Sequence, residues 1–279
     1  ALQMPVGSES GFSGVVDLLT MKATIGKGKD AKEQDVPAEV ADEAQAARDA
    51  LIEEIAGTDE ALMEKFFEND TLTAEELASG LRRAVAEGTI VPVLCGAATS
   101  QIGVAPLLNA VAAIVPAPSE RSAWKGQRGA EEVELSADPE GPLAAVVFKT
   151  MRDPFVGRLS LVRVISGRLA KDSQAVNARS GHKERLSGLT LIVGKETSDV
   201  DAIVAGDMAC IAKLEATVTG DTLCDPKNVV SFEMPSLPEG MHAAAMEAEA
   251  RADEDKLSGA LAQIAEEDVG FTYERTAET

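Results

Sequence analysis

The chain has 279 residues, a net charge of −21 and only 3% aromatic residues. This length exceeds the roughly 100 to 200 residues of one domain, so two or three folded units are expected. With 45% hydrophobic and 26% charged residues, the composition is globular and excludes a disordered chain. No run approaches the roughly 18 apolar residues of a membrane span and no basic-then-apolar leader opens the chain, which predicts a soluble, cytoplasmic protein without a membrane partner.

The first region, residues 1–115, is predicted to alternate strands and helices. An apolar run over 12–19 indicates a strand, and the polar stretch 26–35 indicates a turn or the tip of a hairpin. Apolar residues then recur at spacings of three and four from Pro37 onward. This pattern predicts an amphipathic helix that ends near Gly57.

Two more helices are expected before the end of this region. A short one is predicted around 61–67, and Thr73 and Glu76 have the spacing of a capping box. Because Gly88 is a typical stop signal, the capped helix is predicted to run from Thr73 to that glycine.

Residues 89–118 are predicted to form the closing strand, loop and helix of an α/β sheet. The helix would carry four apolar residues on one face, namely Leu107, Leu108, Val111 and Ile114. Ligands of such sheets bind at the loops that follow the strands, so 95–100 is a candidate binding loop. A plain tight turn built from small residues is the alternative.

The rest of the chain divides into three segments by composition. Residues 116–141 are rich in Pro, Gly and Glu and are predicted to be a linker, with a strand around 133–135. Residues 142–235 contain short strands between Gly, Asp and Ser breaks, which predicts a small β-barrel. Its strands are expected at 143–150, 158–167, 174–179, 185–194 and 208–214.

The last segment, residues 236–279, is predicted to be a β-α-β unit. Strands are expected at 242–250 and 270–278, and the helix between them is expected to be capped by Asp253. Roughly 40 residues are too few to fold without help, so the unit is expected to be cut short at Thr279.

Charge is distributed unevenly along this acidic chain. Residues 142–230 carry 12 basic and 10 acidic groups, whereas residues 1–115 carry 8 and 19. Residues 149–185 include nine basic groups and only three acidic ones. Such a local excess of positive charge indicates a candidate phosphate-binding surface. The alternative is an ordinary solvated strand face, which the charge count alone favours slightly.

The sequence gives little support for a metal site or a catalytic nucleophile. His182 and His242 are the only histidines and have no zinc-site spacing. The three cysteines are far apart and form no C-x-x-C pair, so a disulfide framework is not expected and they are interpreted as buried small residues. No metal site is predicted.

The order of motifs resembles elongation factor G along essentially the whole chain. The resemblance covers 3–23, the helices of 37–87, the loop within 93–104, the barrel segments 147–167 and 219–226, and the C-terminal stretch 253–271. It implies a multidomain α/β and all-β fold: the C-terminal part of a GTPase domain with a helical insert, a translation-factor β-barrel (domain II) and the start of a ferredoxin-like domain (domain III). An excised internal piece of such a factor is expected.

The resemblance also implies a guanine-contacting loop at Gly96, Ala97 and Ala98. The family usually has Gly-Ser-Ala followed by Lys at the matching positions, where this chain has Gly96, Ala97, Ala98 and Ser100. The serine hydroxyl and the lysine charge are therefore absent from this loop. GTP or GDP and Mg²⁺ are expected to bind the full-length parent, and none of them is expected on this piece.

The sequence lacks the motifs that hold nucleotide phosphates. It contains neither G-x-x-x-x-G-K-[ST] nor N-K-x-D, and its one D-x-x-G, Asp138–Gly141, lies in the predicted linker and is assigned to chance. Phosphoryl transfer depends on positioning and charge stabilisation by those parts, so no catalytic residue is predicted. The parent is expected to be a GTPase and these 279 residues to be inactive.

The ribosome is the partner that the resemblance implies, and no DNA partner is expected. The helices of 37–87 would meet the ribosomal stalk protein, and the barrel would contact small-subunit RNA, mainly at phosphate and sugar. The leading RNA-binding candidates are Lys149, Arg152, Arg158, Arg163 and Arg168. Three alternatives stay open: a release-factor relative, a tetracycline ribosomal protection relative, and a non-catalytic ribosome-binding paralogue.

Overall fold

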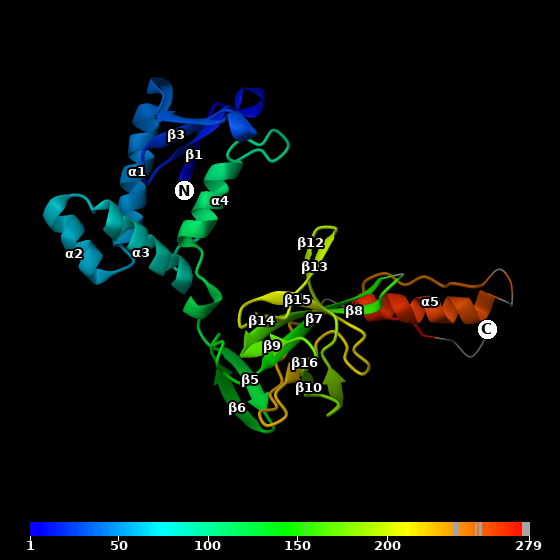
Figure 1. Ribbon diagram of the computed structural model, residues 1–279. Coiled ribbons are helices and arrows are strands. Elements are labelled where there is room, and N and C mark those ends of the chain that lie inside the picture. The colour runs from blue at the N-terminus through cyan, green and yellow to red at the C-terminus, as the bar shows by residue number, and fades with distance from the viewer. Residues whose placement is uncertain (154, 237–239, 249, 251–252, 275–279) are drawn as a thin grey trace. The chain divides into compact units, whose positions relative to one another are not determined.

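A computed structural model describes residues 1–153, 155–236, 240–248, 250 and 253–274 (Figure 1). The chain divides into two compact units, Ala1–Glu120 and Arg121–Thr279. None of the helices that the structure describes has the length and apolar content that crossing a membrane requires.

An antiparallel sheet opens the first unit. Its strands follow the order β1-β2-β3-β4 and span Gln3–Val6, Gly14–Asp17, Lys22–Ile25 and Lys32–Asp35. The strand expected within 12–19 is confirmed as β2. The polar stretch 26–35 is more than a hairpin tip, because its second half is β4, which pairs with β3. All four residues of β4 are exposed, and charged side chains suit an edge strand.

The helices of the first unit agree with the sequence pattern. They are α1 Ala41–Ala56, α2 Glu60–Asn69, α3 Ala74–Glu87 and α4 Val104–Ile114. The capping box of α3 is present: the Glu76 N–H donates to Thr73 Oγ1 at 3.3 Å, and the Thr73 N–H donates to Glu76 Oε2 at 3.0 Å. Hydrogen bonds from Lys65 and from the N–H and hydroxyl of Thr73 lower the pKa of the Glu76 carboxyl to about 2. Gly88, with φ of +76°, ends α3 as expected.

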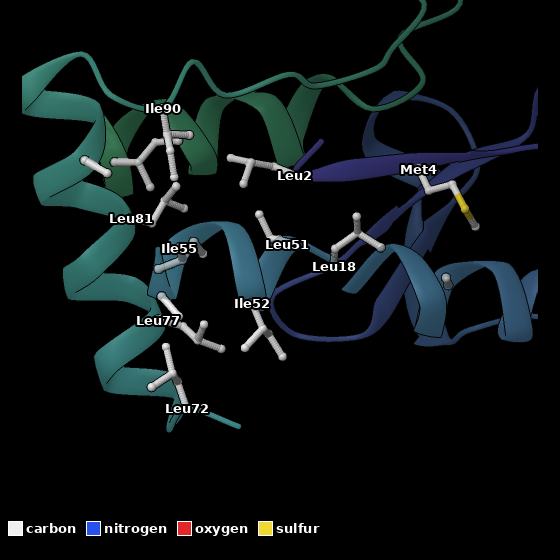
Figure 2. Close-up of a cluster of buried hydrophobic side chains, with 14 of the residues drawn as sticks. Leu2, Met4, Leu18, Leu51, Ile52, Ile55, Leu72, Leu77, Leu81 and Ile90 are labelled. Carbon is white, nitrogen blue, oxygen red and sulfur yellow. The ribbon is translucent and has the colours of Figure 1, made fainter. Parts of the chain in front are cut away.

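One apolar core joins the sheet to helices α1, α2 and α3 and to Ile114 at the end of α4. Figure 2 shows Leu18 of the sheet region beside Leu51 of α1, and Ile55 of α1 beside Leu77 and Leu81 of α3. Packing between α3 and its neighbours is tight, because a methyl group added at Gly80 would come within 2.6 Å of Leu62 Cδ1.

The strand expected before the candidate loop does not form. Among the described residues, the backbone of 91–94 has a single hydrogen bond to a neighbouring segment, from the Leu2 N–H to the Val93 carbonyl at 2.9 Å. A strand requires a ladder of such bonds, and one bond does not make a ladder. The segment also leaves its side chains uncovered, with Val91 80% exposed.

An eight-stranded sheet dominates the second unit. The strand order is β11-β10-β16-β7-β8-β15-β12-β13, and β9 pairs separately with β14. In chain order the strands are β7 Ala144–Asp153, β8 Gly157–Ser166, β9 Arg168–Ala170, β10 Gln174–Asn177, β11 Lys183–Arg185, β12 Leu189–Val193, β13 Glu196–Asp199, β14 Ala202–Val204, β15 Met208–Ala212 and β16 Thr222–Cys224.

This sheet wraps around one core, as a barrel does. Ala175 of β10 and Leu189 of β12 lie near opposite ends of the strand order, yet both belong to the same buried cluster as Val162 of β8. The five expected strands are therefore confirmed. The sequence pattern missed the short strands β9, β11, β13, β14 and β16.

Part of the predicted linker is a hairpin. Strands β5 Trp124–Arg128 and β6 Glu131–Leu135 pair antiparallel, so the strand expected near 133–135 is confirmed but has a partner. Leu135 packs with Val230 and Phe232 against the outer side of the sheet. Only glycine fits at position 126, because a Cβ there would lie 2.7 Å from Val230 Cγ1.

The last helix, α5 Glu254–Glu267, is confirmed. Asp253 stands at its N-cap but makes no side-chain hydrogen bond there. No strand forms in 242–248 or at 250, nor in 270–274, because no described segment pairs with them; residues 249 and 275–278 of the predicted strands lie outside the described residues.

Candidate functional site

The loop between residues 95 and 103 makes a tight reversal of the chain before α4. Ala97 and Ile102 are bridged by two backbone hydrogen bonds, of 2.9 and 3.1 Å. Inside this bridge the Gln101 N–H donates to the Ala98 carbonyl at 3.2 Å, and Gln101 has a φ of +59°. The predicted loop is thus an ordered turn.

Neighbouring segments hold this turn from both sides. Cys95 N–H donates to Gln3 Oε1 of β1 at 3.4 Å, and Gly28 N–H donates to the Gln101 carbonyl at 3.0 Å. At Gly103 the φ is +76°, and a Cβ would lie 2.8 Å from the Cys95 carbonyl oxygen. A side chain at that position would push the turn away from α4.

Two hollows flank the turn. The first, of about 180 Å³, lies against α4 and is lined by residues that include Gly96, Ala97, Ala98 and Leu107. The second, of about 420 Å³, lies toward the sheet and includes Phe12 and Lys27 in its lining. Among the described residues, no acceptor is bonded to the backbone N–H groups of Gly96 and Ala98. The turn can therefore offer N–H donors to a ligand oxygen.

The first hollow has no charged group in its lining, since none of the residues that form it is Asp, Glu, Lys, Arg or His. Burial raises the pKa of the Cys95 thiol, which keeps it protonated and unreactive. Ser100 Oγ donates to the Ala97 carbonyl at 3.4 Å, so its hydroxyl is engaged within the turn. Neutral donors without an acid or base suit recognition of a carbonyl group.

The five basic candidates do not lie on one surface. In the ladder of β7 and β8, Arg152 is directly opposite Arg158, and directly opposite residues project from the same face of a sheet. Lys149 is opposite Leu161, so with Arg163, two residues further along β8, it lies on the other face. Arg168 belongs to β9, in the small sheet with β14.

Arg152 and Arg158 are engaged by α5. Arg152 Nη2 and Nε donate to Glu266 Oε2 at 2.9 and 3.2 Å, and Arg158 Nη2 lies 3.6 Å from Glu266 Oε1. The Arg152 backbone N–H donates to Glu267 Oε1 at 2.5 Å. In contrast, Lys149, Arg163 and Arg168 form no ion pair with any residue that the structure describes.

A buried polar network that the sequence pattern missed fixes the loop before β16. Arg179 Nε and Nη2 donate to the two carboxylate oxygens of Asp221 at 2.6 and 2.8 Å, and Asn177 Nδ2 donates to Asp221 Oδ2 at 2.8 Å. Glu184 accepts hydrogen bonds from the Glu215 N–H and the Ala216 N–H, at 3.0 and 2.8 Å. Such contacts, which link positions more than 30 residues apart, leave no local signal.

Hydrogen bonds outweigh burial for both carboxylates of this network. Burial raises the pKa of Glu184, but the N–H groups of Glu215 and Ala216 and the Thr217 hydroxyl bring it below the ordinary value. Burial likewise raises the pKa of Asp221, and the Arg179 guanidinium is the main group that lowers it. Both carboxylates are therefore ionised near neutral pH and serve to hold the loop.

The described residues contain no group of three or more His, Cys, Asp and Glu side chains arranged to hold a metal ion. Of the three cysteines, Cys210 and Cys224 are buried as expected, and Cys95 is half-buried. None of the three forms a disulfide.

Comparison with known proteins finds two family models and a similar solved structure. The model of elongation factor G domain 2 matches residues 142–226, and the model of elongation factor G domain III matches residues 237–279. The crystal structure of ttk003000868 from Thermus thermophilus matches with a TM-score of 0.82 at 29% identity. That match covers 100% of this chain and 40% of the Thermus chain.

Proposed function

Because this chain is elongation factor G-like and carries the domain 2 and domain III of that translation factor, we propose that it is part of a ribosome-dependent GTPase that acts in translocation. The chain spans 40% of the length of the Thermus protein it matches, so the activity proposed is that of a larger molecule. The observation that carries the proposal is a barrel whose Lys149, Arg163 and Arg168 have no ion-pair partner among the described residues, on an otherwise acidic chain.

Small-subunit ribosomal RNA is the proposed partner of the barrel. Lys149 and Arg163 share one face of β7–β8, and Arg168 begins the next strand. Since the net charge of −21 repels a polyanion at long range, binding depends on local basic groups that are not already neutralised. The helices of the insert, α1 to α3, are proposed to meet the ribosomal stalk protein.

The 95–103 turn is proposed to contact the guanine base of GTP or GDP in the complete factor. Gly96, Ala97 and Ala98 line the hollow beside α4, and the free N–H groups of the turn suit the base's carbonyl oxygen. The chain contains no phosphate loop to hold Mg²⁺ and the phosphates, so we propose that these 279 residues do not hydrolyse GTP.

An uncovered apolar face beside the turn supports this assignment. Val93, Leu107, Leu108, Val111 and Val115 are all exposed. Several exposed apolar residues on one short helix and its flanks are typical of a surface that another part of a protein covers. We propose that the nucleotide-binding part of the factor covers this face.

Ribosome co-sedimentation at low salt tests the proposal. The variant K149E/R163E reverses two charges on the outer face that have no ion-pair partner in the described part of the chain. The control K195E/K227E reverses two charges on turns elsewhere in the same unit. We expect K149E/R163E to weaken binding roughly tenfold and the matched control to weaken it less than about twofold. Equal binding by the two variants would contradict the proposed RNA contact.

A further inference from the structure

Arg152 and Arg158 form a positively charged notch near the turn that joins β7 to β8. The two side chains stand opposite each other in the ladder, and both contact Glu266 of α5. Arg158 is only 17% exposed, and its Nε is buried without a hydrogen-bond partner among the described residues. Arg158 Nη1 also donates to the Glu215 carbonyl at 3.5 Å, so among the described contacts only its buried Nε is left without an acceptor.

The groups in this notch recognise carboxylates and phosphates alike. A guanidinium presents its N–H donors in a planar fork that matches both anions. Glu266 accepts from two nitrogens of Arg152, and Glu267 accepts from the Arg152 backbone N–H. Two adjacent carboxylates thus occupy the place that the oxygens of a phosphate group would take.

Contacts that hold α5 on the barrel are weak enough to be exchanged. The helix has 14 residues, a length at which an isolated helix is only marginally stable in water. Its apolar side chains are poorly covered, with Leu257 and Leu261 half-buried and Ile264 exposed. The Glu266 ion pairs are partly exposed, and such pairs contribute little and weaken with salt.

We propose that the Arg152–Arg158 notch is an anion site with two alternative occupants, the acidic end of α5 and a phosphate of the RNA that the barrel binds. This inference rests on the proposed function, since it takes RNA as the partner. RNA entering the notch displaces Glu266 and Glu267 and releases α5. Docking of α5 and full engagement of RNA by the barrel are then mutually exclusive.

Two measurements on the full chain test the exchange. The first is the affinity of E266Q/E267Q for a fluorescein-labelled RNA duplex. Its matched control is E247Q/E254Q, which removes the same charge at residues that make no ion pair with the barrel in the described part of the chain. We expect E266Q/E267Q to bind the RNA about threefold to tenfold more tightly than this control. Combining E266Q/E267Q with R152Q/R158Q should abolish this gain in affinity. The second is hydrogen exchange of the α5 amides, which we expect to accelerate when the RNA is added to the unsubstituted chain.

Equal RNA affinities of E266Q/E267Q and E247Q/E254Q would overturn the inference. So would hydrogen exchange of the α5 amides that stays the same when RNA is added. Failure of the notch inference and failure of the proposed function give different results. If K149E/R163E reduces ribosome binding while E266Q/E267Q binds RNA no more tightly than its control, only the notch inference fails. If K149E/R163E leaves ribosome binding intact while RNA still accelerates α5 exchange, the proposed outer-face contact fails and the notch inference stands.

Discussion

The two units of the chain differ in how completely they cover their apolar and polar groups. In the second unit the sheet encloses its core, and the buried carboxylates of Glu184 and Asp221 have hydrogen-bond donors from several directions. In the first unit, α4 and the segment before it leave apolar side chains in contact with solvent, with Val91 80% and Leu108 62% exposed. The barrel core is covered on all sides by its own sheet, whereas the first unit exposes apolar side chains near its candidate binding turn.

The largest expected effect is a loss of stability from the barrel core. Leu223 of β16 is fully buried within that core, so L223A should lower the free energy of unfolding by about 2–5 kcal/mol. The control V193A, at a residue 76% exposed, should change it by less than about 0.5 kcal/mol. Urea unfolding followed through a probe in the second unit measures both values. A loss of similar size in both variants would show that the barrel core is not closed.

A smaller effect is expected from the pH dependence of the barrel. The pKa values of Glu184 and Asp221 lie below the ordinary 4.5 and 3.8, because hydrogen bonds to their charged forms outweigh burial. Groups with a lowered pKa in the folded state contribute stability above the ordinary values, and this stability is lost as the pH falls through and below them. Urea midpoints of the second unit should therefore drop between about pH 6 and about pH 3.

Glutamine and asparagine substitutions isolate that pH dependence. The variant E184Q/D221N should be less stable near neutral pH but should lose less stability on acidification, since neither position titrates. A drop of the same size in this variant and in the unsubstituted chain would assign the pH dependence to other carboxylates.

The smallest effect on stability is expected at the open face of the first unit. Because Leu108 and Val111 of α4 are exposed, L108S/V111S should change the free energy of unfolding by less than about 0.5 kcal/mol. The same substitutions should reduce self-association in sedimentation velocity experiments, since they remove apolar surface. A large loss of stability would mean that this face is part of the core.

Elements with local signals were predictable from the sequence. Thr73 and Glu76 place the start of α3, and Gly88 places its end, because capping depends on residues within one turn. The hairpin β5–β6 was expected only as one strand, since its first strand reads WKGQR and is mostly polar. Its first strand packs against Val230 and is bridged to Ser231, which come from a distant part of the chain.

The candidate sites show the same limit. The position of the 95–103 turn follows from its small residues, but the clamp from Gln3 and Gly28 comes from distant segments. Likewise, the charge count treats the basic residues of 149–185 as equivalent. Only the β7–β8 register separates Lys149 and Arg163 from the two arginines that α5 neutralises. Pairing between residues so far apart in the chain is not visible in a charge pattern.

We propose that these 279 residues bind to the ribosome but do not bind GTP by themselves. Calorimetric titration of the chain with GTP and Mg²⁺ measures this directly. We expect no Mg²⁺-dependent heat at micromolar or submillimolar GTP, because the turn offers only backbone donors and no phosphate-binding loop is present. Tight, Mg²⁺-dependent binding of GTP would show instead that this chain holds a nucleotide without a phosphate loop.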